Sequence, residues 1–202
     1  MTVRIMIAED QTMVRQALVA LLELEADLDV VAQAADGDEA LAMARKHRPD
    51  VAVLDIEMPG PSGIQVASQL SASGFAGSIV IVTTFDRPGY LRAAMAAGAR
   101  GFLLKDAPAA DLAAAIRRVA AGERVVDPAL AAAALAQGDS PLTDRETEVL
   151  AAAAGHDVIA GIAARLHLSP GTVRNHLSAA IQKLGARNRA DAARIAKEKG
   201  WL

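Results

Sequence analysis

Residues 51–60 read VAVLDIEMPG, an apolar run that ends at the acidic residue Asp55 and is followed by a Pro-Gly turn. An apolar run without polar interruption is typical of a strand buried on both faces of a parallel sheet. We therefore predict a strand over Val51–Asp55. Similar runs rich in Val, Ile and Leu occur elsewhere in the first part of the chain, at Val3–Ala8, Val30–Ala34, Ile79–Thr83 and Gly101–Leu104.

The segments between these runs have the apolar spacing of helices. They are Thr12–Glu23, Asp38–Lys46, Gly63–Leu70, Gly89–Ala97 and Ala109–Ala121. Strands that alternate with helices of this length favour a parallel sheet with helices on both faces. The sequence thus predicts an α/β domain with a doubly wound (βα)5 fold.

The rest of the chain has a different pattern. Residues 123–140 contain Pro128 and the alanine-rich stretch Ala129–Ala136, and we predict a linker with one short helix there. From Pro141 onward the pattern is purely helical, over Asp144–Ala154, Ile159–Leu166, Pro170–Leu184 and Ala190–Lys199. We expect a first domain at 1–122, the linker at 123–140 and an all-α domain at 141–202.

Composition narrows the class of protein. The chain of 202 residues has no cysteine, which excludes disulfides, thiolate metal sites and a cysteine nucleophile. It has no long run of bulky apolar residues and no signal-peptide pattern at its start, so we expect no membrane insertion and a cytoplasmic location.

Residues 1–140 carry 12 Lys and Arg against 18 Asp and Glu, a net charge of −6, whereas residues 141–202 carry nine against six, a net charge of +3. The basic C-terminal domain indicates an anionic partner.

Three carboxylates fall at the ends of predicted strands. Glu9 and Asp10 follow the first strand, and Asp55 ends the third. In the common strand order 2-1-3-4-5 these strands are neighbours, and ligands of open α/β sheets bind beyond their carboxyl ends. Clustered carboxylates repel one another unless a cation neutralises them, and oxygen ligands suit Mg²⁺. The sequence therefore predicts a magnesium site.

Two further strand ends carry groups that would stabilise a phosphoryl group. Thr83 closes the fourth strand with a hydroxyl, and Lys105 follows the fifth with an ammonium. Together with Mg²⁺, they could neutralise and hydrogen-bond a phosphoryl group on an Asp55 oxygen.

These residues, with their surrounding sequence, resemble the receiver domain of two-component response regulators over about 1–120. The motifs are ED at 9–10, DIEMPG at 55–60, TT at 83–84 and GFLLK at 101–105. The resemblance implies that Asp55 takes phosphate from a phosphohistidine of a sensor histidine kinase. It implies that Mg²⁺ is held by Glu9, Asp10, Asp55 and the main-chain carbonyl of Glu57. It also implies that Thr83 and Phe102 form a switch pair, in which the hydroxyl moves toward the phosphate and the aromatic ring follows it inward.

A helix-turn-helix is predicted in the basic domain. Ser169 is a good N-cap and Pro170 a good first helical residue, and the preceding helix ends three residues earlier. The second helix has a buried stripe and leaves Arg174, Asn175 and Ser178 on its other side. Arg and Asn carry the donor groups that match guanine and adenine edges. The stripe consists of Val173, Leu177, Ile181 and Leu184.

The segments LTDRETEVL at 142–150 and TVRNH at 172–176 are similar to the LuxR-type DNA-binding domain, over about 141–202. By this resemblance Arg174, Asn175 and Ser178 face bases and the last helix supplies dimer contacts. Thr172 and Lys183 would contact DNA phosphates. Two positions depart from the family pattern, His156 and Gly161, and Gly161 inside a helix is expected to weaken it.

Both halves together resemble NarL/FixJ-type response regulators, and some stretches resemble the DesR branch, although neighbouring branches share the same residues. The resemblance implies a non-enzymatic transcriptional regulator, in which phosphate on Asp55 promotes a homodimer that binds promoter DNA. One alternative is an atypical regulator that binds DNA without phosphate. A phosphatase of the haloacid-dehalogenase type also has an acid two residues after its nucleophile, as Glu57 follows Asp55, but there the nucleophile ends the first strand. A pure phosphate-relay protein would need no basic domain.

Overall fold

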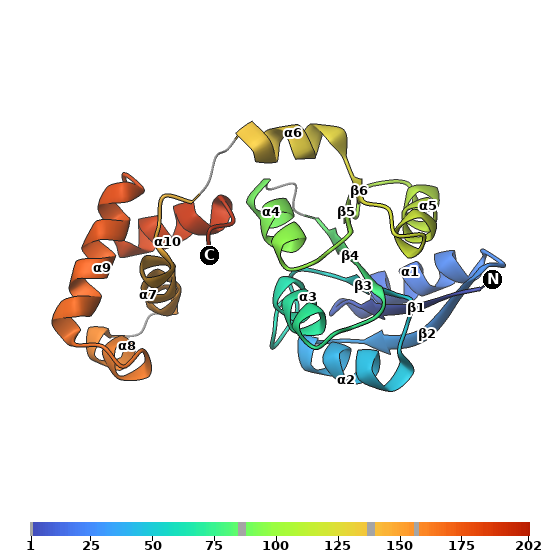
Figure 1. Ribbon diagram of the computed structural model, residues 1–202, viewed down its shortest axis with the longest axis horizontal. Coiled ribbons are helices and arrows are strands. Elements are labelled where there is room, and N and C mark those ends of the chain that lie inside the picture. Colours follow the sequence, from blue (N-terminus) through green and yellow to red (C-terminus); the bar gives the residue numbers. More distant parts are fainter. Residues whose placement is uncertain (1, 85–87, 137–139, 156–157) are drawn as a thin grey trace. The chain divides into compact units, whose positions relative to one another are not determined.

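A computed structural model of the chain describes residues 2–84, 88–136, 140–155 and 158–202 (Figure 1). The chain divides into two compact units. The first is Met1–Asp86 with Leu91–Ala131, and the second is Arg87–Tyr90 with Ala132–Leu202. We call them the sheet unit and the helical unit. The domain limits 1–122, 123–140 and 141–202 stay a prediction.

The sheet unit contains a parallel sheet in the order β2-β1-β3-β4-β5-β6. Its strands are β1 (Val3–Ala8), β2 (Leu28–Ala34), β3 (Val51–Leu54), β4 (Ser78–Thr83), β5 (Gly101–Leu104) and β6 (Val125–Val126). The doubly wound α/β fold is thus confirmed, and the five predicted strands lie where the apolar runs place them to within two residues. The sixth strand was not predicted. Its two residues pair with Gly101 and Phe102, but two residues are too few to show a periodicity.

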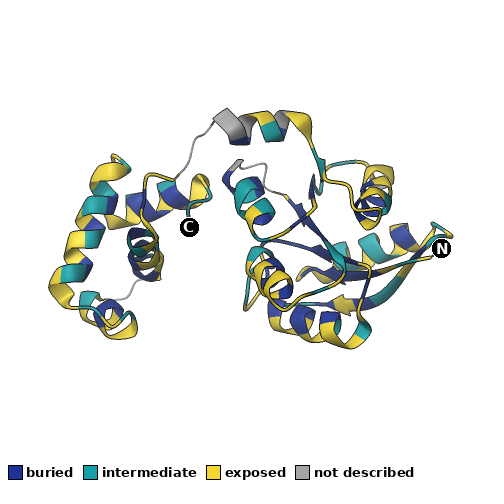
Figure 2. Ribbon diagram, viewed as in Figure 1, coloured by how far each residue is buried: buried dark blue, intermediate teal, exposed yellow. Residues whose placement is uncertain are grey.

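Helices follow the strands in the part of the chain that the structure describes. They are α1 (Thr12–Glu23), α2 (Gly37–His47), α3 (Gly63–Ala72), α4 (Pro88–Ala96) and α5 (Ala109–Ala120). Helices α1 and α5 pack on one face of the sheet, where Leu22 and Ile116 join a core of strand residues such as Val53. Helices α2 and α3 lie on the other face (Figure 1). The strands are therefore buried on both sides, while the outer helix faces are exposed (Figure 2), as continuous apolar strands require.

The helical unit has its own core. Its helices include α7 (Asp144–Ala154), α8 (Ile159–Arg165), α9 (Pro170–Lys183) and α10 (Arg189–Glu198), preceded by α6 (Pro128–Ala136), which extends across the division between the units. The core contains apolar residues of α7, α8, α9 and α10, among them Leu150, Ile162 and Val173, and Trp201 packs against it. The predicted all-α helix-turn-helix domain is confirmed. Within the described ranges, every helix is too short or too polar to span a bilayer.

Helix ends in this unit are marked by the residues that the sequence indicates. The side chain of Ser169 accepts a hydrogen bond from the Thr172 amide at 3.0 Å, and Pro170 is the first residue of α9. In the turn between α8 and α9, His167 has a φ of 53°. A left-handed residue reverses the chain within a short turn, and this allows α9 to follow α8 closely.

Candidate functional site

Three carboxylates meet at the carboxyl edge of the sheet. Glu9 and Asp10 follow β1 and Asp55 follows β3, and these strands are neighbours. One carboxylate oxygen from each residue lies within 4.8 Å of the other two. Glu9 is only 1% exposed and Asp55 5%, whereas Asp10 is exposed. The predicted convergence of the three acids is confirmed.

Lys105 supplies the positive charge of the site. Its Nζ lies 2.6 Å from Glu9 Oε2 and 3.0 Å from Asp55 Oδ2, and its side chain is 11% exposed. The amide of Lys105 donates to the Thr83 carbonyl at 2.8 Å, which joins the ends of β5 and β4. One ammonium therefore serves two buried carboxylates.

Burial and pairing oppose each other in this cluster. Burial raises the pKa of both Glu9 and Asp55, against the lowering effect of the Lys105 ammonium. Burial also lowers the pKa of Lys105, but its two carboxylate partners outweigh this effect and the net direction is upward. The lysine is thus firmly charged, while the two acids lack sufficient positive charge nearby.

The two predicted switch residues are both fully buried. Thr83 ends β4 and Phe102 lies in β5, opposite Ile81 of β4. The structure brings Thr83 to the same sheet edge as Asp55 and Lys105, since their strands are adjacent. The movement of the hydroxyl and ring that the resemblance implies stays a prediction.

Two glycines that were not predicted as site residues lie in close contact with the loop after Asp55. A Cβ on Gly63 would lie 1.9 Å from the main-chain oxygen of Asp55, and one on Gly37 would lie 2.0 Å from that of Pro61. The amide of Gly63 donates to the Ile56 carbonyl at 3.0 Å. The loop carrying the exposed residue Glu57 is thus packed directly against two helix starts. For Gly63, the signal in the sequence was a glycine at the first helical position, directly after Ser62, which caps the helix.

Arg15 of α1 also contacts the cluster and was not predicted. Its Nη1 donates to the main-chain oxygen of Glu9 at 2.5 Å. The amide of Gln11 donates to Glu9 Oε1 at 3.2 Å. These contacts fix the turn that carries Glu9 and Asp10.

The donor set fits a hard divalent cation. It offers three carboxylates, two of them buried, and no nitrogen or sulfur ligand, which is the chemistry that Mg²⁺ favours. A cation would also supply the positive charge that the buried acids lack. The acidic cluster could therefore hold a metal ion.

The predicted base-facing residues lie together on α9. Arg174, Asn175 and Ser178 are exposed, while Val173 and Leu177 are buried in the core of the helical unit. Thr172 lies at the start of the helix, with its Oγ1 2.8 Å from Ser169 Oγ. The predicted stripe therefore faces the core, with Ile181 and Leu184 only partly buried. The DNA contacts of Arg174, Asn175, Ser178 and Thr172 stay predictions.

Lys183 is placed differently from the other predicted contacts. Its Nζ lies 2.7 Å from Glu146 Oε2 on α7. Glu146 was not predicted as a functional residue, although its place three residues after the capping Thr143 was a recognisable signal. The phosphate role of Lys183 stays a prediction.

Of the two positions that depart from the LuxR-type pattern, only Gly161 lies in the part of the chain that the structure describes. Gly161 lies within α8 and is exposed, and a Cβ there would meet only Val158 Cγ2 at 3.9 Å. No close approach therefore requires glycine at this position. His156 lies outside the described residues.

Family models match both units. The family described as response regulator receiver domain matches residues 5–117, and the family described as bacterial regulatory proteins, luxR family, matches residues 140–196. Together these matches include every predicted site residue.

Curated relatives match along the whole chain. The uncharacterized transcriptional regulatory protein YvfU of Bacillus subtilis is 49% identical over 200 residues, which cover 99% of this chain and 100% of that protein. The transcriptional regulatory protein DesR of the same organism is 45% identical, with 99% of each chain covered. Among solved structures, the response regulator ChrA of a heme-sensing two-component system is 34% identical with a TM-score of 0.59, over 100% of this chain and 99% of that one.

Proposed function

This chain belongs to the response regulators that join a receiver domain to a LuxR-type DNA-binding domain, and we propose that its receiver accepts a phosphoryl group on Asp55 from a phosphohistidine of a sensor histidine kinase. The observation that carries this proposal is the environment of Asp55. Its carboxylate is buried, lies 3.0 Å from the Lys105 ammonium and shares its pocket with Glu9 and Asp10. As a regulator of transcription, the chain needs no turnover of a substrate, and we infer that it is not an enzyme.

The proposed transfer exchanges one bond for another. A carboxylate oxygen of Asp55 attacks phosphorus, the P–N bond to the kinase histidine breaks, and the imidazole leaves with the bonding electron pair and takes up a proton. Lys105 stabilises the negative charge on the phosphoryl oxygens through its ammonium, and the Thr83 hydroxyl donates a hydrogen bond to one of them. Arg15 and Gly63 keep the acidic turn and the Asp55 main chain in place.

We propose Mg²⁺ as the cofactor of this step. Glu9, Asp10, Asp55 and the main-chain carbonyl of Glu57 would hold it. When bound, Mg²⁺ neutralises charge on the phosphoryl group. The burial of two of these acids beside a single lysine supports the assignment.

The output is sequence-specific binding of promoter DNA. In this proposal Arg174, Asn175 and Ser178 read base edges in the major groove, and Thr172 contacts a phosphate near the start of the helix. Phosphorylation shifts the receiver toward a form that pairs with a second copy, through Thr83 and Phe102. A homodimer then presents two recognition helices to a two-fold operator, and affinity rises through effective concentration. We infer a cytoplasmic location, since the proposed DNA and kinase partners would meet the chain there.

The test compares phosphorylated and unphosphorylated chain. The chain is incubated with acetyl phosphate and Mg²⁺, and phosphate incorporation, oligomeric state and mobility shift of genomic DNA fragments are measured, with Asp55→Asn as the control. We expect incorporation, dimer formation and tighter binding of a subset of fragments, all absent in the control. Tight binding that is the same with and without phosphate would favour the alternative, a phosphate-independent regulator. Steady release of phosphate from a generic phosphoester would instead indicate a phosphatase.

A further inference from the structure

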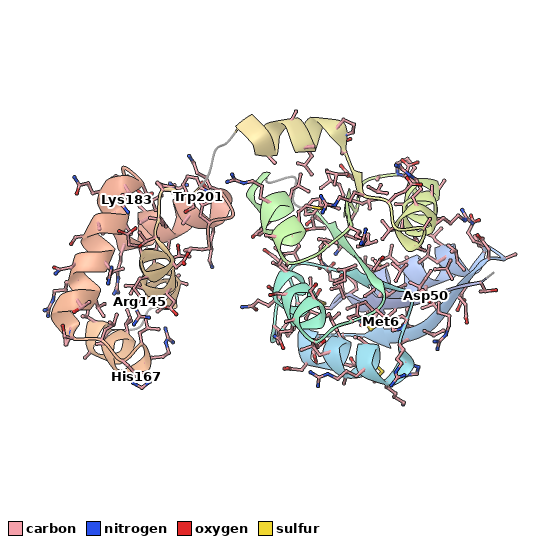
Figure 3. The ribbon with its side chains drawn as sticks, viewed as in Figure 1. Met6, Asp50, Arg145, His167, Lys183 and Trp201 are labelled. Carbon is pink, nitrogen blue, oxygen red and sulfur yellow. The ribbon has the colours of Figure 1, made fainter. Side chains whose placement is uncertain are left out.

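The start of α7 contacts both helices of the helix-turn-helix. Arg145 Nη2 donates to the carbonyl of Leu166, the residue that ends α8, at 3.0 Å. The next residue, Glu146, pairs through Oε2 with Nζ of Lys183, the last residue of α9, at 2.7 Å. Figure 3 labels Arg145 on α7 and Lys183 on α9. Adjacent residues of one helix thus hold the ends of the two others.

Glu146 is held in place by hydrogen bonds at the start of its own helix, in addition to its pair with Lys183. Its amide donates to Thr143 Oγ1 at 3.3 Å, and its Oε2 accepts from the Thr143 amide at 2.8 Å. This reciprocal capping box places the carboxylate at the buried start of α7, where its side chain is only 8% exposed. The side chain of Lys183 is 37% exposed, and its ammonium lies against this less exposed carboxylate.

The position of Lys183 on α9 separates it from the base-facing residues. Arg174 precedes it by nine residues, which corresponds to about 13 Å along the helix axis and a rotation of about 180°. Lys183 is therefore on the opposite side of α9 from Arg174, and there its ammonium meets Glu146 of α7. The N-terminal residues of a recognition helix contact base edges, and Lys183 lies at the other end.

Moving the Lys183 ammonium to a DNA phosphate would leave the Glu146 carboxylate buried without its cation. Leaving a carboxylate that is only 8% exposed without its cation is unfavourable. Contact with a phosphate would therefore have to compensate for the lost pair, whereas an exposed lysine could make the same contact without this loss.

We propose that Lys183 and Glu146 form a positioning pair, which sets the orientation of α9 on α7 and so the presentation of Arg174, Asn175 and Ser178 to DNA, and that Lys183 does not neutralise a phosphate. The proposal rests on the DNA-binding function proposed above. In this proposal Lys183 influences DNA binding through its ion pair with Glu146 and does not contact the DNA itself.

The test measures how DNA affinity depends on salt. Genomic duplex fragments selected with the full-length phosphorylated chain serve as the specific probe, and a random-sequence duplex as the nonspecific one. The variants are Lys183→Met, Glu146→Gln and the double variant, with Lys46→Met as a matched loss of an exposed lysine on α2. Fluorescence of Trp201 and circular dichroism establish that each variant is folded at the assay temperature.

We expect Lys183→Met to weaken binding of the specific fragment by about two- to thirtyfold, the range for residues that act on a ligand site without touching it. The slope of log affinity against log salt should stay that of the wild type. Glu146→Gln should weaken binding to a similar extent, the double variant should be no worse than either single one, and Lys183→Arg should restore affinity because it keeps the pair. Lys46→Met should leave discrimination between the two probes unchanged.

A direct phosphate contact gives a different pattern. Lys183→Met would then reduce the salt slope by about 0.9, Glu146→Gln would leave affinity unchanged or increase it, and the two effects would add. That result overturns the positioning pair but leaves the DNA-binding function intact. If the wild-type chain selects no fragment at all, the DNA-binding function fails and the positioning role fails with it. If the Met and Gln variants do not fold, loss of affinity or a reduced slope in the folded Lys183→Arg variant overturns the proposal.

Discussion

Replacing Lys105 by methionine tests the charge balance of the phosphorylation site. The substitution removes the ammonium but keeps most of the side-chain volume. Glu9 and Asp55, which are 1% and 5% exposed, would lose the cation that lies 2.6 Å and 3.0 Å from them. We expect the sheet unit to become less stable near neutral pH, where both carboxyl groups are charged in the unfolded chain.

The expected loss follows from the burial of the pair. Removing one partner of a buried ion pair costs about 3–5 kcal/mol. Lys105 is 11% exposed and therefore partly solvated, and the acids can take up protons, so the lower end of the range, about 3 kcal/mol, applies. Mg²⁺ bound to the folded site should restore a similar amount, about 2.7 kcal/mol when its concentration is about 100 times its dissociation constant.

The pH dependence gives the sign of the effect. Burial already raises the pKa of Glu9 and Asp55, and loss of Lys105 raises both further. The folded variant then binds more protons than the unfolded chain, so its stability decreases as pH rises through the raised folded pKa values. The deficit relative to the wild type should therefore shrink when the pH is lowered toward the ordinary pKa range of carboxyl groups.

One assay separates the two units. The chain has a single tryptophan, Trp201, and it packs in the helical unit, so its fluorescence reports unfolding of that unit, whereas far-ultraviolet circular dichroism reports both. In urea titrations, Lys105→Met should move the component seen only by circular dichroism and leave the fluorescence transition in place. An unchanged dichroism transition, or one that neither Mg²⁺ nor acid restores, would refute the reasoning.

Four further substitutions test other parts of the structure. Asp55→Asn should abolish phosphate incorporation from acetyl phosphate with the fold retained, and full incorporation in this variant would refute the site. Gly63→Ala places a Cβ 1.9 Å from the Asp55 main-chain oxygen; it should destabilise the sheet unit by about 1–3 kcal/mol and slow phosphorylation, and wild-type values for both would contradict the packing argument. Gly161→Ala adds a Cβ that meets Val158 Cγ2 at an ordinary contact distance of 3.9 Å, and should stabilise the helical unit by up to about 1 kcal/mol, seen as a later Trp201 transition. An earlier one would mean that α8 needs the glycine. Arg174→Ala should reduce operator discrimination by about 1–3 kcal/mol in competition binding, and unchanged discrimination would assign base reading to other residues.

The positions of the site residues could be predicted because topology, not side-chain detail, brings them together. Apolar runs located the strands, and the switch-point rule then placed Glu9, Asp10 and Asp55 at one edge. Strands β4 and β5 lie next to β3 in the sheet, and their carboxyl ends therefore bring Thr83 and Lys105 to the same edge. Each of these inferences needs only the strand order and the residue that follows each strand.

What could not be predicted depends on which atoms face one another. Nothing in the spacing of Gly63 shows that the Asp55 main chain lies against it, and the reach of Arg15 to the Glu9 carbonyl depends on how α1 leaves the sheet. The pairing of Lys183 with Glu146 joins residues 37 positions apart through the packing of α7 on α9. Strand β6 was missed for another reason, because its two residues are too few to show a periodicity.

Charge balance links the proposed cation to the proposed phosphoryl group. The three carboxylates and Lys105 together carry a formal charge of −2 in the ionised site. A phosphoryl group on Asp55 replaces one negative charge by about two, which makes the site more negative while two of its residues remain buried. A divalent cation therefore interacts more favourably with the phosphorylated site, and by reciprocity it stabilises the phosphorylated state by the same factor. Measured cation affinity should consequently rise on phosphorylation, and equal affinities would show that the phosphoryl charge is neutralised by the protein alone.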